Sequence, residues 1–159
     1  MPRPVHVVSL ALALMLSGVA GAADEPKDNR KPVDVDIWVI RASTKSKDIS
    51  PELKSFADKL KQRFKYTGFR LERKIKETVD LGKTLTTSLT GGYQALVTPK
   101  AREKDKGAER LALQLQVLKE KEKKPRMNNE YKLEAGAFQP FGAWDLEGGD
   151  VLIILLSAK

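Results

Sequence analysis

Histidine and cysteine are scarce in this chain, which limits the catalytic groups and metal ligands that it can supply. His6 is the only histidine among 159 residues, and cysteine is absent. Because His6 lies in a segment that we expect to be removed on export, the mature chain would carry neither an imidazole nor a thiol. A Ser-His-Asp triad, a Cys-His pair and any zinc, copper or haem site built on those ligands are then excluded. We therefore predict no cofactor and no metal site.

Carboxylates are the groups left for catalysis, and they would need to face one another across a cleft. Asp34 and Asp36 share one face of an expected strand at its polar beginning, where a solvated strand end explains both. Asp145, Glu147 and Asp150 surround a Gly-Gly pair and could in principle hold calcium. They lack the spacing of a calcium loop, and a hairpin turn explains them with fewer assumptions. We assign no catalytic residue and keep a carboxylate-dependent hydrolase, with acids converging from distant segments, as the alternative function.

Basic residues are concentrated in two parts of a chain with a net charge of +8. Residues 45–76 hold 11 basic and 4 acidic residues, and residues 100–126 hold 10 and 5. Solubility explains a mixed surface of this kind, and contact with an anionic polymer, a membrane face or an acidic partner is the functional interpretation. Nucleic acid is not expected, because the basic stretches lack interleaved aromatics for base stacking. The candidate binding residues are Lys59, Arg63, Lys121 and Lys123.

Three aromatic residues, Phe138, Phe141 and Trp144, form the other candidate binding group. They lie in a segment that also contains Pro140, at a spacing that suits neither a helix nor a simple strand. Two interpretations stay open: the rings cap the end of the core, or they form an exposed aromatic contact surface.

The first residues predict export. Arg3 supplies a positive start, residues 7–16 are apolar apart from one serine, and Ala20-Gly21-Ala22 offers small residues for cleavage. The apolar run is too short for a transmembrane helix. We predict a signal peptide over residues 1–22, a flexible leader over 23–32, a periplasmic or secreted location, and no transmembrane segment in the mature chain.

Residues 33–159 are expected to form a single domain. The terminal run Val151–Leu156 contains six consecutive apolar residues, which is typical of a strand buried on both faces, and the alternating residues 33–40 predict a second inner strand. Ser50-Pro51 supplies the cap and first turn of a helix. Its apolar stripe, which we expect to pack on a sheet, is Leu53, Phe56, Ala57, Leu60 and Phe64.

The middle of the chain predicts one-sided strands. In residues 69–81 the apolar positions share one phase, Gly91-Gly92 marks a hairpin turn, and residues 111–117 and 131–135 predict two further strands. The charged residues 100–109 are expected to form a loop. The predicted fold class is α+β, with a largely antiparallel sheet of about six strands and one amphipathic helix packed on a face.

From these patterns we predict an exported, non-enzymatic protein that acts by binding. An accessory or assembly component of a bacterial envelope is the expected role. Its partner would be an envelope protein or an anionic envelope polymer met by the basic surface.

Overall fold

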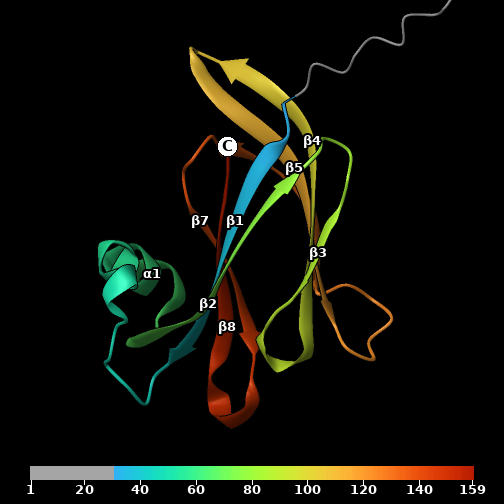
Figure 1. The fold of residues 1–159 in the computed structure, drawn as a ribbon. Coiled ribbons are helices and arrows are strands. Elements are labelled where there is room, and N and C mark those ends of the chain that lie inside the picture. Colours follow the sequence, from blue (N-terminus) through green and yellow to red (C-terminus); the bar gives the residue numbers. More distant parts are fainter. Residues whose placement is uncertain (1–30) are drawn as a thin grey trace, which may run out of the picture.

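A computed structural model of the protein describes residues 31–159, so the predicted signal peptide and most of the leader lie outside the described residues. Eight strands and one short helical segment make up the described part (Figure 1). The strands are β1 Val33–Ser43, β2 Gly68–Val79, β3 Leu85–Ser88, β4 Tyr93–Asp105, β5 Ala108–Lys119, β6 Met127–Glu134, β7 Gln139–Asp145 and β8 Val151–Ala158. The helical elements are η1 Pro51–Phe56 and α1 Ala57–Phe64, with the single turns η2 Thr90–Gly92 and η3 Glu147–Gly149.

The strands form two antiparallel sheets of four, in the orders β2-β1-β8-β7 and β3-β4-β5-β6. The prediction of a largely antiparallel protein with one short helix is confirmed, and so is the inner position of β1 and β8. The prediction of a single sheet of about six strands is wrong. Each of β4 and β5 has one apolar face, and that face covers the first sheet instead of extending it. Alternation shows which face of a strand is apolar, but it does not show which sheet the strand joins.

The inner strand β8 contributes to two hydrophobic clusters, because both of its faces are covered. Leu152, Ile154 and Leu156 point into the cluster between the sheets. Val151, Ile153 and Leu155 alternate with them and point to the side of η1 and α1. The described part is therefore built in three layers: the sheet of β3, β4, β5 and β6, the sheet of β2, β1, β8 and β7, and the helical segment. The helical segment covers the outer face of the sheet that contains β1 and β8 (Figure 1).

The helical segment follows the predicted stripe. Leu53 and Leu60 are buried against the outer face of the first sheet, and Ala57 is buried as well, whereas Phe56 and Phe64 are half-buried in the same cluster as the two leucines. The first turn is a 3-10 helix, and the Ser50 hydroxyl accepts the Leu71 backbone N–H across the loop instead of capping the helix. The expected helix and its buried side are confirmed.

The expected single phase of residues 69–81 is wrong because β2 carries a bulge. The register against β1 shifts between Val39 and Ile40, which leaves Glu72 as an extra residue between Leu71 and Arg73. Phe69 and Leu71, before the bulge, pack on the helix side. Ile75 and Val79, after it, pack between the sheets. A bulge moves the following side chains to the other face of the sheet, and no alternation pattern records it.

The expected loop at residues 100–109 is also wrong. β4 and β5 continue through it to a two-residue turn, Lys106-Gly107, where both residues have positive φ (50° and 85°). Such values suit the tight turns that match the twist of paired strands. The residues of this hairpin end are charged on both faces, so they show no apolar alternation. Ion pairs join them instead, as between Arg110 and Asp105 at 3.0 Å.

Candidate functional site

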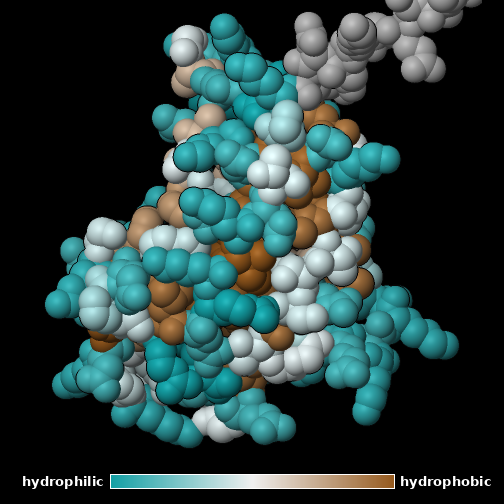
Figure 2. All heavy atoms as spheres, in the orientation of Figure 1, coloured by the Kyte–Doolittle hydropathy of each residue, from teal (hydrophilic) through white to brown (hydrophobic). Residues whose placement is uncertain are grey.

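The predicted residues Lys59 and Arg63 lie exposed on α1. With three neighbours they form a group that we call the helix face: Lys54, Lys59, Lys61, Arg63 and Lys65. No residue of the helix face makes an ion pair with any residue in 31–159. Figure 2 shows the surface around α1 as largely hydrophilic, with apolar side chains between the polar ones.

Several cations of the second sheet are neutralised by neighbouring carboxylates, in contrast to the helix face. Arg102 lies 2.6 Å from Glu109, and Lys132 lies 2.8 Å from Glu103. The same arrangement joins Lys100 to Glu130 and Arg110 to Asp105. The positive charge of these strands is therefore largely compensated locally.

The other predicted basic pair, Lys121 and Lys123, lies in the exposed loop between β5 and β6. In Figure 1 this loop projects on the far side of the sandwich from α1. The loop also carries Glu122, which pairs with Arg126 and has a lowered pKa because Arg126 donates hydrogen bonds to it. The structure therefore does not bring the two predicted basic pairs together.

The predicted aromatic residues point to different layers. Phe138 lies on the helix side, where the centroid of its ring is 4.9 Å from that of the Trp38 ring. Phe141 lies between the sheets, is 4% exposed and packs 4.6 Å from the ring of Tyr131. Trp144 is half-buried at the end of the same core, next to Tyr93. These three rings do not form one exposed surface, and their role in binding stays a prediction.

The acids singled out in the sequence have structural partners. Asp34 accepts the Thr78 hydroxyl at 2.7 Å, and Asp36 accepts the Trp38 indole N–H at 2.9 Å. Asp145 and Glu147 lie exposed at the β7–β8 turn. Within residues 31–159 no group of three or more carboxylates is arranged to hold a metal ion.

Sequence reasoning missed a charged cluster around Arg41, near the end of β1, which we call the Arg41 cluster. Arg41 on β1 lies directly opposite Arg70 on β2, an arrangement that is unfavourable for two like charges. Glu72 relieves it: one of its oxygens lies 2.7 Å from Arg41 Nε and 3.3 Å from Arg70 Nη2. Asp150, the residue before β8, lies 3.5 Å from Arg41 on the other side. Arg41 is thus held between carboxylates from two distant segments.

The β2 bulge gives this cluster its geometry. It allows Glu72 to reach Arg41 and also to accept the hydroxyl of Thr90, in the turn between β3 and β4 of the second sheet. Bulges often redirect side chains in this way near functional sites. Partial burial acts to raise the pKa of Glu72, but hydrogen bonds from Thr90 and Arg41 outweigh it and hold the pKa below its usual value. A hydrogen bond from Ser43, with the contact to Arg41, lowers the pKa of Asp150.

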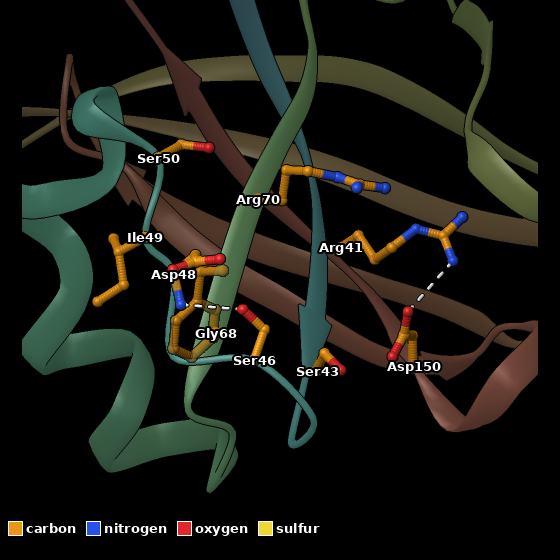
Figure 3. Close-up of a pocket in the computed structure, with 10 residues that line it drawn as sticks. Arg41, Ser43, Ser46, Asp48, Ile49, Ser50, Gly68, Arg70 and Asp150 are labelled. Atoms are coloured by element: carbon orange, nitrogen blue, oxygen red, sulfur yellow. Dashed lines mark hydrogen bonds and ion pairs between the residues drawn. The ribbon is translucent and has the colours of Figure 1, made fainter.

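A pocket of about 440 Å³ opens beside the cluster. Figure 3 shows the side chains of Arg41 and Arg70 extending in the same direction from neighbouring strands, with Asp150 below Arg41. The other wall is the loop between β1 and η1, which can approach β2 because residue 68 is glycine: a Cβ there would lie 2.7 Å from the Ser46 carbonyl oxygen. The pocket is lined by Arg41, Ser43, Ser46, Asp48, Ile49, Ser50, Gly68, Phe69, Arg70 and Asp150.

The sequence indicates one residue of this cluster. Arg41 is the only charged residue within 37–42, the inner part of the first strand, and a cation at such a position needs a partner. The identity of the partner depends on the bulge and on the packing of the second sheet, which local patterns do not reveal.

No helix among residues 31–159 has the length and apolar character needed to cross a membrane. Comparison of the chain with protein-family models, curated proteins and solved structures finds no significant match.

Proposed function

We propose that this protein is an exported, non-enzymatic binding protein of a bacterial envelope, and that the helix face contacts anionic envelope material. The observation that carries the proposal is the set of five exposed cations on one short helical segment, none of them paired within residues 31–159. Residues 51–65 contain these five cations and two acids, Glu52 and Asp58, which gives a local charge of 5 − 2 = +3.

Unpaired surface cations attract a polyanion more strongly than paired ones, because a neighbouring carboxylate cancels the field of a paired cation. At physiological ionic strength this field is screened within about 8 Å. A cluster on one side of the molecule therefore acts at short range, and its effect falls as salt is added. An accessory or assembly role would follow if the anionic material is part of an envelope structure.

The proposal is tested with polyphosphate immobilised on beads, against uncharged beads, in a salt titration. We expect the purified protein to be retained by polyphosphate at about 50 mM salt and released by about 500 mM, where the screening length falls below about 5 Å. Equal retention on charged and uncharged beads, or retention that does not depend on salt, would count against binding through the helix face.

Export is a separate part of the proposal and needs its own measurement. The intact mass of the protein recovered from the periplasmic or secreted fraction should correspond to a chain that begins at Ala23. A recovered protein that still contains Arg3 and His6 would contradict export, and the mature chain would then keep the one histidine of the sequence.

A carboxylate-dependent hydrolase is the second candidate, and one observation favours it: Glu72 and Asp150 come from distant segments and meet at Arg41 beside a pocket. The pKa values of both acids are lowered, so both are ionised at neutral pH, whereas a general acid needs a raised pKa. We therefore place binding first. Release of reducing ends from an envelope polysaccharide by the wild type, but not by Asp150→Asn, would reverse that order.

A further inference from the structure

The pocket beside Arg41 has a lining with balanced charge. Two cations, Arg41 and Arg70, are matched by two acids, Asp48 and Asp150. A small anion in this pocket would meet the two carboxylates, and a cation would meet the two guanidinium groups. Charge therefore favours neither, and the ligand that fits is an uncharged one with many polar groups.

The lining also offers hydrogen-bond donors that no residue in 31–159 uses. Ser46 and Ser50 accept backbone N–H groups through their hydroxyl oxygens, which leaves each hydroxyl proton free to be donated. Arg41 donates through Nε and Nη1, and Arg70 donates through Nη2 alone. A guanidinium has five N–H donors, so both arginines keep unused ones.

Acceptors and an apolar wall complete the set. Asp48 and Asp150 supply carboxylate oxygens, and the half-buried Ile49 lines the same pocket with carbon atoms. Neighbouring hydroxyls on a ring each donate and accept a hydrogen bond, so they match a site where fixed donors and acceptors lie side by side. The C–H groups of such a ring can rest against Ile49. The volume of about 440 Å³ is within the range of small-molecule sites.

We propose that this pocket binds a saccharide, as an uncharged ring with neighbouring hydroxyls. Arg41 and Arg70 donate hydrogen bonds to oxygen atoms of the saccharide, and Asp48 accepts hydrogen bonds from its hydroxyl groups. Ser46 and Ser50 contribute further donors. Glu72 positions the two arginines. The inference does not depend on the helix face, because the expected ligand carries no charge.

The test is protein-observed NMR with three uncharged disaccharides as probes: maltose, cellobiose and chitobiose. We expect at least one probe to shift the backbone amide signals of residues 43–50 and 68–70 in a saturable way. Inorganic phosphate at the same concentration should not shift them. Saccharide-induced shifts confined to other parts of the chain, or none from any probe, would overturn the proposal. Phosphate that shifts the same signals and competes with the saccharide would show an anion site instead.

Variants separate the pocket from charge in general. Arg70→Met removes donors from an arginine whose side chain is 69% exposed, and we expect the probe to bind at least about tenfold more weakly. Lys83→Met, at an exposed position between β2 and β3, removes the same charge elsewhere and should leave binding unchanged. Asp48→Asn keeps the shape of the side chain and should also weaken binding, so a misfolded Arg70 variant would not end the test. Unchanged affinity in both folded pocket variants would overturn the proposal. Loss of saccharide binding with intact polyphosphate binding would leave the function of the helix face standing.

Discussion

The helical segment is expected to be held to the first sheet by a small number of buried side chains, and Leu60 is the most direct place to test this. Leu60 is fully buried, 0% exposed, in the cluster on the outer face of that sheet. Leu60→Ala removes three carbon groups from this cluster. At about 0.8 kcal/mol for each buried group, the lost transfer free energy is about 2.4 kcal/mol.

The cavity left by the substitution adds to this cost. Leu→Ala substitutions in cores cost about 2–5 kcal/mol in total, with the spread set by how far the surroundings collapse. α1 has only 8 residues and lies at the surface, so it can settle toward the sheet and close part of the cavity. We therefore expect the free energy of unfolding to fall by about 2.5–3.5 kcal/mol, in the lower half of that range.

Equilibrium unfolding in urea, followed by tryptophan fluorescence, measures this change. Trp38 packs in the same cluster and 5.7 Å from the ring of Phe56, so its emission reports on this layer. Lys61→Ala is the matched control, because Lys61 is exposed on the same helix, and its effect should stay within about 0.5 kcal/mol. Equal losses for the two variants would show that α1 does not pack as described.

Two further predictions concern Glu72 in the Arg41 cluster and Gly142 in the edge strand β7. The lowered pKa of Glu72 means that its ionised form stabilises the fold above its unfolded pKa, near 4.5, and that this contribution is lost as pH falls through the folded value. Glu72→Gln should therefore lose less stability than the wild type between about pH 6 and pH 3 in urea titrations, and an identical pH profile would refute the role of Glu72. Gly142→Ala should cost more than Gly136→Ala by about 2 kcal/mol or more in the same assay, because both have positive φ but only at Gly142 would a Cβ lie 2.6 Å from a backbone oxygen, that of Leu152. Similar losses would mean that the close approach of β7 to β8 is relaxed in solution.

Short-range patterns predicted the parts of the fold that depend on local burial. The six apolar residues of β8 fill both of its faces, and the stripe around Leu60 identifies the buried side of the helix. The Gly91-Gly92 turn was also readable, because both glycines have positive φ in the connection that joins β3 to β4. In each case the residues that carry the signal are also the residues that are buried or bent.

The remaining features depend on contacts between distant segments. The division into two sheets is decided by which apolar faces meet, and the turn at Lys106-Gly107 lies in a hairpin with no apolar face to predict it. In the Arg41 cluster, Arg41 contacts Glu72, which is 31 positions away in the sequence, and Asp150, which is 109 positions away. A single bulge residue decides which side chains of β2 meet Arg41, and a sequence that alternates on both sides of the bulge cannot reveal it.

The proposed function depends on the helix face, and one comparison of two charge-reversed proteins tests it most directly. Lys59→Glu with Arg63→Glu reverses two cations on α1, whereas Lys83→Glu with Lys106→Glu reverses two exposed lysines in turns between strands. The two proteins have the same net charge and differ only in its position. With a contact between exposed charges worth about 1 kcal/mol at 4 Å, we expect the α1 variant to bind polyphosphate at least about tenfold more weakly than the turn variant at low salt. Equal weakening of the two folded proteins would show that binding follows net charge and would contradict a role for the helix face.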